Sequence, residues 1–275
     1  MRVPAVAVRF LAVAALLALP SISAAPAVAT TPTAAGVHGA DISWPNCPKG
    51  MGIPKRRTEG QPMPTRGASF VIVGLTNGPG FYPNPCLGDQ LSWVSAHQRL
   101  LAAYAMTTYP RKWQIRRYGT TGPYDATASR GALRNAAYAE AGFNLSTMTA
   151  AAMTVPMIWV DVEPYPTFPW TKSHAANRAV VRSVIRAYRD AGYRVGIYTY
   201  PNGWKDVVGS WRLPSLPTWS TIGGGRAAHA ERACGHGPSG GEDWIMQWWT
   251  NHRDKDLICP AGAEQGATIF ASASA

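Results

Sequence analysis

The feature that most restricts the fold is an alternation of short, apolar, β-like runs with longer helical stretches. In the clearest helical stretch, residues 171–191, Val180, Val184 and Tyr188 share one face with arginines opposite, and Gly192 ends the pattern. Strands that alternate with helices predict a parallel sheet. We expect helices over residues 87–98, 124–142 and 171–191. We expect strands over residues 39–44, 68–76, 100–109, 155–163, 194–200, 217–222, 243–250 and 255–259.

The number of strands separates two α/β architectures. About eight strands favour an irregular (β/α) TIM-like barrel, with few helices between the last strands, over a doubly wound open sheet. No glycine-rich loop of the G-x-G-x-x-G type opens a helix, and Gly223-Gly224-Gly225 lacks that spacing. The sequence therefore predicts a barrel that does not bind a nucleotide, and we expect no cofactor.

The N-terminus has the pattern of an export signal. Arg2 and Arg9 precede the apolar residues 11–19, and small residues follow over 21–29. An uncleaved membrane anchor is the alternative, but a bilayer-spanning helix needs about 20 apolar residues. We expect no transmembrane segment in the mature chain and an extracellular location, in solution or at the cell wall. The predicted divisions are a signal peptide 1–25, a flexible leader 26–36, a barrel 37–260 and a tail 261–275.

Cysteine content and charge agree with an exported protein. Four cysteines allow three disulfide pairings, of which we favour Cys47–Cys86 and Cys234–Cys259 because these close local loops. A zinc site is the alternative, but no C-x-x-C pair is present and the histidines lack metal spacing. The formal charge of +11 predicts attraction to anionic polymers, such as wall material or membrane surfaces. We expect no nucleic-acid partner, because the basic residues are scattered and form no nucleic-acid motif.

The run from Trp159 to Glu163 carries the clearest chemistry. Side chains alternate across a strand, so Trp159, Asp161 and Glu163 point one way and the two valines the other. In a barrel, the two acids would then face the interior at the end of a strand, where barrel enzymes place their active sites. Two close carboxyl groups supply an acid beside a base, which cleavage of a glycosidic bond requires. The alternative is a pair of acids that form salt bridges with nearby arginines.

Several motifs occur in an order typical of one enzyme family. They are Gly-Ala-Asp-Ile-Ser-Trp at 39–44, Phe-Val-Ile-Val at 70–73, Asp-Val-Glu at 161–163, Gly-Ile-Tyr-Thr at 196–199, and Trp244 with Gln247 and Trp248. In this order the chain resembles the glycoside hydrolase family 25 lysozymes and the related glycoside-hydrolase-like domains of secreted bacterial proteins. The resemblance covers about residues 37–259.

The resemblance implies an irregular α/β barrel that hydrolyses the β-1,4 bond after N-acetylmuramic acid in peptidoglycan or a related anionic wall glycan. Glu163 matches the proton donor of the family, and Asp161 and Asp41 match the acids that assist it. The residues expected to contact the substrate are Tyr104, Tyr198, Trp219, Gln247 and Trp248.

The chain departs from the family pattern at four places. Residues 45–47 read Pro-Asn-Cys where the family usually has a Gln, and residues 74–78 replace a Lys-Ala-Thr-Glu-Gly type run. Tyr104 is followed by Ala105 instead of His, and residues 256–258 shorten an Asp-Leu-Asn element. These departures favour an alternative, a non-catalytic module that binds wall glycan on the same barrel. A third hypothesis is an adhesion protein that uses its basic surface.

Overall fold

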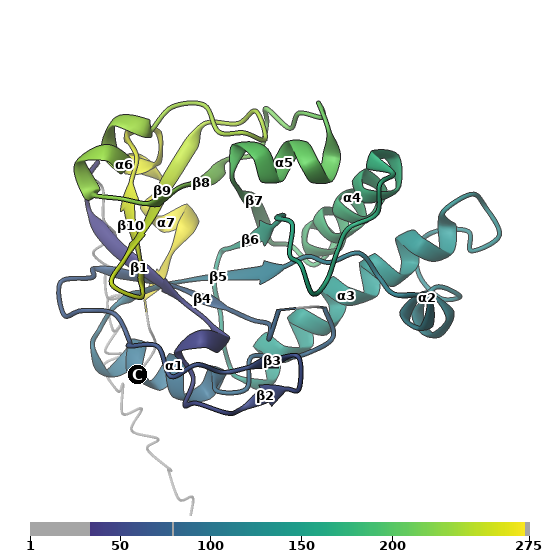
Figure 1. Cartoon of the computed structure of the whole chain (residues 1–275), viewed down its shortest axis with the longest axis horizontal. Helices are drawn as coiled ribbons and strands as arrows, with labels where there is room; N and C mark the ends of the chain where they lie inside the picture. Colours follow the sequence, from purple (N-terminus) through teal and green to yellow (C-terminus); the bar gives the residue numbers. More distant parts are fainter. Residues whose placement is uncertain (1–33, 79, 273–275) are drawn as a thin grey trace, which may run out of the picture.

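A computed structural model describes residues 34–78 and 80–272 of the chain (Figure 1). The predicted signal peptide and residues 26–33 of the predicted leader lie outside the described residues. Within the described part of the chain, no helix has the length and apolar character that crossing a membrane requires.

Eight strands form a closed barrel. Around the barrel the order is β5-β4-β1-β10-β9-β8-β7-β6, and the pairing of β6 with β5 closes the ring. The predicted α/β barrel is therefore confirmed. The strands are β1 (His38–Ile42), β4 (Phe70–Gly74), β5 (Leu100–Met106), β6 (Met157–Asp161), β7 (Arg194–Thr199), β8 (Thr218–Gly224), β9 (Asp243–Thr250) and β10 (Arg253–Ile258).

One strand breaks the expected parallel arrangement. Strand β10 runs antiparallel to both of its neighbours, β9 and β1. Only Asn251 and His252 join β9 to β10, and both have positive φ values, 51° and 57°. A two-residue turn of this kind can only reverse the chain, because a parallel connection needs a crossover of a dozen or more residues.

All three predicted helical stretches contain a helix. Two of them, α1 and α4, match their predicted stretches closely, and α3 begins and ends later than expected. We did not predict α2, α5 or α6. The helices are α1 (Leu87–Ala96), α2 (Lys112–Tyr118), α3 (Gly131–Ala150), α4 (His174–Asp190), α5 (Pro201–Val208), α6 (Ala227–Ala233) and α7 (Gly266–Ile269). The shorter elements are the 3-10 helices η1 (Trp44–Asn46) and η2 (Pro260–Gln265) and the strands β2 (Gly52–Ile53), β3 (Arg56–Arg57) and β11 (Ala271–Ser272).

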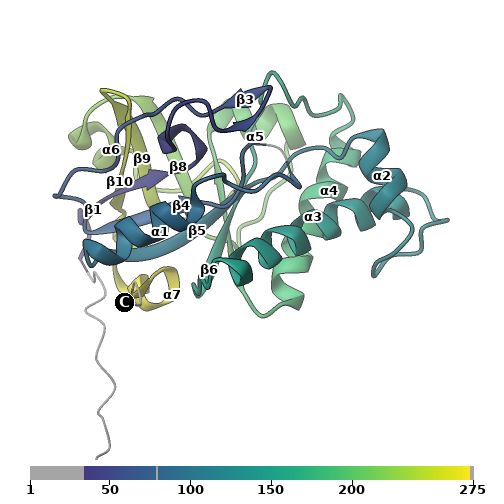
Figure 2. The same cartoon turned by 90° about the horizontal axis from the view of Figure 1, so that it is seen from below.

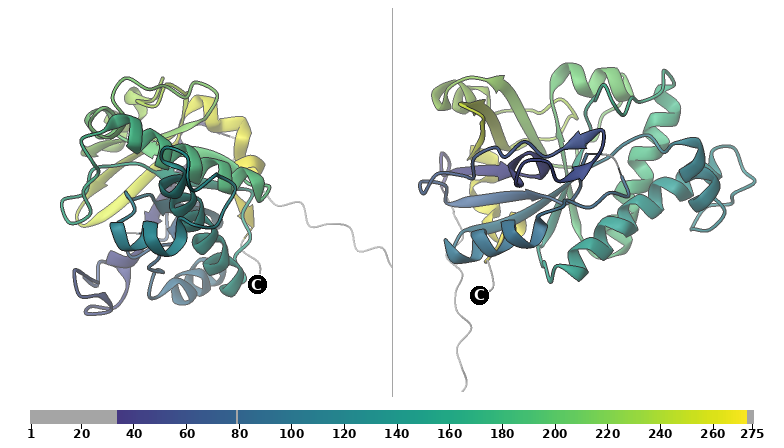
Figure 3. Two further views of the ribbon diagram at one scale, coloured as in Figure 1. Left: turned by 90° about the vertical axis from the view of Figure 1, so that its right-hand side faces the viewer. Right: turned by 60° about the horizontal axis from the view of Figure 1, so that its bottom comes forward.

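The late start of α3 has a local cause. Arg130 has a φ of 62°, so the chain turns there and cannot continue a helix from residue 124. Gly131 begins the helix in close contact with the Asp125 carbonyl, where a Cβ atom would lie 1.7 Å from the oxygen. The helix then runs beside α4 on the outside of the barrel (Figure 3).

The core has two layers that follow the alternation of side chains along the strands. Trp159 packs inside the barrel with Phe70, whereas Val160 packs outside it in the same cluster as Val180 of α4. Trp159 and Val160 are both fully buried. The predicted orientation of the strand 155–163 is therefore confirmed, and it directs the acids that follow Trp159 to the mouth of the barrel.

Residues 261–272, which we expected to belong to a tail after the barrel, pack against it. Ile269 and Phe270 are buried, and the rings of Phe270 and Phe70 have centroids 4.6 Å apart. Strand β11 pairs with the beginning of β5. This segment therefore covers the end of the barrel at which the parallel strands begin, near α7 in Figure 2. Burial of these apolar side chains explains why the chain remains folded beyond β10.

Both favoured disulfide pairings are confirmed. Cys47 is bonded to Cys86, which attaches the loop after β1 to the start of α1. Cys234 is bonded to Cys259, which attaches the end of α6 to the end of β10. The first bond holds the loop that carries β2 and β3 over the barrel mouth.

Glu140 of α3 predicts a pH-dependent stability. Its side chain is 1% exposed and accepts a hydrogen bond from the Thr108 N–H at 3.1 Å. Burial raises the pKa of Glu140 from 4.5 to about 8. Below pH 4.5 the group is neutral in both the folded and the unfolded chain. Between pH 4.5 and about 8 only the unfolded chain ionises fully, so stability decreases as the pH rises.

We expect Glu140→Gln to remove this contribution, because Gln is neutral and can still accept the Thr108 hydrogen bond. Urea unfolding of both proteins should show similar stabilities at pH 4.5 and a growing advantage for the variant toward pH 8. A stability difference that does not change with pH would contradict the prediction.

Candidate active site

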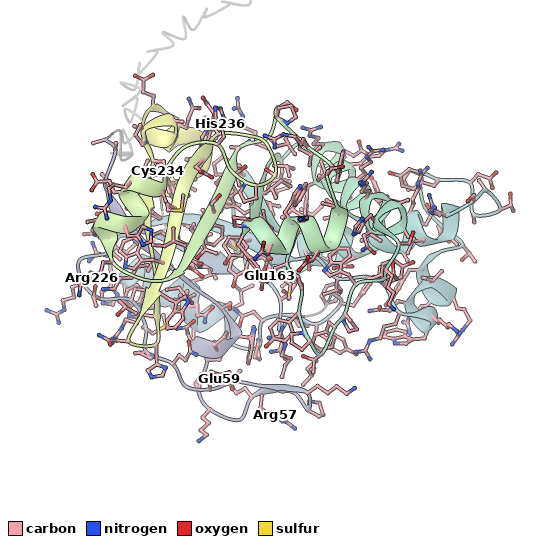
Figure 4. The ribbon with its side chains drawn as sticks, turned by 45° about the horizontal axis from the view of Figure 1, so that its top comes forward. Arg57, Glu59, Glu163, Arg226, Cys234 and His236 are labelled. Atoms are coloured by element: carbon pink, nitrogen blue, oxygen red, sulfur yellow. A yellow bond between two sulfur atoms is a disulfide. The ribbon has the colours of Figure 1, made fainter. Side chains whose placement is uncertain are left out.

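The main cleft of the described chain, about 680 Å³ in volume, opens at the barrel mouth. It lies where the parallel strands end, the position at which barrels of this class place their chemistry. In Figure 4, Glu163 lies near the middle of the molecule, and Glu59 and Arg57 lie on the segment below it. The acidic residues that line the cleft are Asp41, Glu59, Asp161, Glu163 and Asp254.

Strand β6 positions the two predicted central acids. Asp161 is the last residue of the strand and is 4% exposed, whereas Glu163 follows it in the loop and is half-buried. Burial, and secondly the charge of Glu163, raise the pKa of Asp161 well above its usual value. Burial also raises the pKa of Glu163 to about 7. Within the described residues, Asp161 Oδ1 is buried and has no hydrogen-bond partner.

A hydrogen-bond network holds the side chain of Asp41, the acid on β1. Gln247 Nε2 donates to Asp41 Oδ2 at 2.8 Å, and the Tyr198 hydroxyl donates to Gln247 Oε1 at 2.9 Å. Asp256 lies beside Asp41 and accepts a hydrogen bond from Trp219 Nε1 at 2.8 Å. Burial, followed by the charges of Asp254 and Asp256, raises the pKa of Asp41 well above its usual value. The network therefore holds Asp41 in place at the floor of the cleft.

Arg56 is the one Lys or Arg among the described residues that line the cleft, and we did not predict it. It is 5% exposed, and its guanidinium carbon lies 3.4 Å from the centre of the Tyr165 ring and 4.7 Å from that of Trp44. Its positive charge lowers the pKa of both Asp161 and Glu163 and so opposes the effect of burial. The sequence signal was only a basic loop, because β3 is two residues long.

The acids of the cleft form no salt bridge. In the part of the chain that the structure describes, the one ion pair within 4.0 Å joins Arg186 to Asp190 on the outer face of α4. Asp161 and Glu163 are therefore not held by the arginine pairing that was the alternative for this motif. Both remain open to the cleft, which both of them line.

Seven of the eight predicted catalytic and substrate-contacting residues line this one cleft, namely Asp41, Tyr104, Asp161, Glu163, Tyr198, Trp219 and Gln247. Trp219 is 1% exposed and packs against the rings of Tyr104, Tyr198 and Trp159. Trp219 therefore forms part of the floor of the cleft, with its ring almost fully buried.

The prediction for Trp248 is wrong. Gln247 faces the cleft, so the side chain that follows it on β9 points outward, where Trp248 packs with Met246 and Leu257. The next residue, Trp249, returns to the cleft side and lines the rim with 54% of its surface exposed. The same alternation rule, applied to residues 243–250, would have identified Trp249.

Two acids on β10 also escaped the prediction. Asp254 and Asp256 are two residues apart and face the barrel interior beside β1. Burial raises the pKa of Asp254 to about 6 and that of Asp256 well above its usual value. Their spacing was a signal, but a short polar strand does not show which of its faces is buried.

Part of the chain is similar in sequence to lysozyme-like proteins. The family model described as "Lysozyme-like protein 1" matches residues 134–233, the part of the chain that holds α3, β6, α4, β7, α5, β8 and α6. Lysozyme-like protein 5 of Caenorhabditis elegans is 32% identical over 66 residues, which is 24% of this chain and 29% of that protein. The match thus spans less than a third of the length of this curated relative.

Solved structures share the fold over most of this chain at low sequence identity. A family GH25 lysozyme from Aspergillus fumigatus aligns with a TM-score of 0.55 at 16% identity, over 84% of this chain and 99% of that one. The autolysin LytC from Streptococcus pneumoniae, solved with a synthetic peptidoglycan ligand, aligns with a TM-score of 0.52 at 13% identity, over 81% and 46%. The predicted resemblance is confirmed: the chain has the barrel fold of the family 25 lysozymes, and residues 134–233 match the lysozyme-like family.

Proposed function

We propose that the protein is a secreted glycoside hydrolase that cleaves β-1,4 bonds of peptidoglycan or a related wall glycan. The observation that carries this proposal is the pair Asp161 and Glu163 in an open cleft, where burial raises the pKa of Glu163 to about 7. A carboxyl group with this pKa retains a proton near neutral pH, which a general acid requires.

Each acid has a distinct role in the proposed reaction. Glu163, the more exposed of the β6 pair, protonates the oxygen of the leaving sugar. Asp161 and Asp41, when ionised, stabilise the positive charge that develops on the sugar ring. The Tyr198–Gln247 hydrogen bond holds the amide that positions Asp41, and the exposed ring of Trp249 offers a surface on which a sugar can stack.

A non-catalytic glycan-binding module on the same barrel is the second candidate. Arg56 favours it, because its charge lowers the pKa of Glu163 and so works against a protonated acid. Release of reducing ends separates the two functions. We expect the purified protein to release reducing ends from isolated peptidoglycan. If the protein binds cell wall but releases no reducing ends from peptidoglycan or chitin, the non-catalytic binding module is supported and the enzyme proposal is wrong.

The Arg56 charge also predicts the pH dependence of hydrolysis. Because Glu163 has a pKa of about 7, kcat/KM should fall above that pH, approaching about tenfold per pH unit. Arg56→Gln removes a charge that lowers this pKa, so the alkaline limb should move to higher pH. The pH profile of kcat/KM on a soluble glycan checks both statements. A limb that stays in place or moves to lower pH in the variant would contradict the role of Arg56.

A further inference from the structure

A second cavity, of about 430 Å³, lies beside the main cleft, and we call it the side pocket. Its charged lining consists of Lys55, Arg111 and Lys112, and no Asp or Glu is among the described residues that line it. Aromatic rings complete the wall, including Trp113 and Phe168. The side pocket therefore combines positive charge with flat apolar surface.

A wall of two aromatic rings separates the side pocket from the main cleft. Tyr165 lines the cleft and Phe168 lines the side pocket, and their rings stack with centroids 6.3 Å apart. The guanidinium of Arg56, on the cleft side, lies 5.4 Å from the Phe168 ring, and that of Arg111, on the other side, lies 5.3 Å from it. The two cavities therefore lie next to each other, on opposite sides of one layer of aromatic rings.

The two cavities are lined by different kinds of charged residue. Five acids and one arginine line the cleft, whereas three cations and no acid line the side pocket within the described residues. An anionic branch would be attracted to the three cations of the side pocket, where no acid among the described lining residues opposes them, so the charges favour one orientation of a ligand that occupies both cavities. A ligand that fits both cavities has a neutral main chain, which lies in the cleft, and a branch with carboxylates, which lies in the side pocket.

Exposed tryptophans mark both cavities independently of charge. In the described part of the chain, the large hydrophobic side chains classed as exposed are Trp113, at 39%, and Trp249, at 54%. Trp249 lines the cleft and Trp113 lines the side pocket. Exposed large apolar side chains at the rim of a cavity are typical of ligand contacts.

We propose that the side pocket binds the acidic peptide carried by a glycan strand whose sugars lie in the main cleft. A muramyl sugar carries its peptide on a lactyl ether of the ring. The sugar chain and the peptide carboxylates therefore extend in different directions from the same sugar. The preferred substrate is then a peptide-substituted glycan and not a bare one such as chitin. This inference rests on the proposed glycosidase function.

Paired substrates test the inference. The ratio of kcat/KM on peptide-bearing glycan to that on the same glycan stripped of peptide by an amidase is measured for each protein. We expect a wild-type ratio well above one and a decrease of about tenfold in the double variant K55Q/K112Q, since each lost exposed ion pair weakens binding modestly. The double variant K172Q/K205Q changes the charge equally, at exposed lysines that line neither cavity, and should keep the wild-type ratio. Equal rates on both substrates, or an unchanged ratio in K55Q/K112Q, would overturn the inference and leave the glycosidase proposal standing.

A binding experiment tests the side pocket independently of the proposed glycosidase activity. The free stem tetrapeptide is titrated into the protein while the indole N–H resonance of Trp113, assigned with Trp113→Phe, is followed by NMR. We expect a saturable shift that is much weaker in K55Q/K112Q and with a peptide whose carboxyls are amidated. This readout needs no hydrolysis, so it stays valid if the protein releases no sugar. No shift with the acidic peptide, or equal shifts with the amidated one, would overturn the inference.

Discussion

Glu163→Gln is expected to lower kcat for peptidoglycan hydrolysis by about 10²- to 10⁴-fold, the contribution of a positioned general acid. Gln keeps the size and polarity of the side chain, but its amide cannot protonate the leaving oxygen. Because Glu163 is half-buried and forms no ion pair among the described residues, the change should leave the barrel folded and glycan binding largely intact. Reducing-end release and binding to insoluble wall measure the two properties separately.

Glu59→Gln is the matched control for this prediction. Glu59 lines the same cleft but is exposed, and it accepts a hydrogen bond from Gln61 at 2.8 Å. Its replacement should therefore have a much smaller effect on kcat. Similar losses in both variants would show that the negative charge of the cleft matters more than a proton on Glu163, and the assignment of the acid would then be wrong.

Trp159→Ala is expected to lower the free energy of unfolding by about 3–5 kcal/mol, the usual cost of removing a buried aromatic side chain. The Trp159 side chain is fully buried inside the barrel and packs edge-on against Trp219, with ring centroids 6.1 Å apart. The ring also covers Gly196 of β7, where an added Cβ atom would lie 2.3 Å from it. No other side chain can fill this space without moving a strand, so a cavity remains beneath Asp161.

Urea unfolding of Trp159→Ala and Trp249→Ala tests this expectation. Both variants lose the same atoms, but Trp249 is 54% exposed at the rim of the cleft. Its replacement should change stability by no more than about 0.5 kcal/mol and should weaken glycan binding instead. Equal losses of stability in the two variants would contradict the two-layer description of the barrel core.

Much of the fold was predictable because local patterns decide it. The apolar stripe on α4 and the apolar runs of the parallel strands show which face of each element is buried. This holds whichever element packs against that face. The short helices α2, α5 and α6 were missed because seven or eight residues span only about two helical turns. Pro201 at the start of α5 was a usable signal that we did not apply.

The candidate site was predictable in part. Alternation along β6 directed Asp161 and Glu163 to the barrel mouth, and the family-like motif order added Asp41, Tyr198 and Gln247. The same rule was applied incompletely to β9, where Trp248 was chosen in place of Trp249. The order of motifs along the chain does not report which residues between them fold back over the cleft.

By itself, the sequence determined the faces of the strands, the closing of two local disulfide loops and the presence of two acids at the end of β6. Only the tertiary structure decided that Arg56 lies over Tyr165, and that Asp254 and Asp256 join Asp41. A side-chain pattern follows from the geometry of one element. The meeting of β1 with β10, more than 200 residues later, depends on how the barrel closes and on the packing of every strand between them.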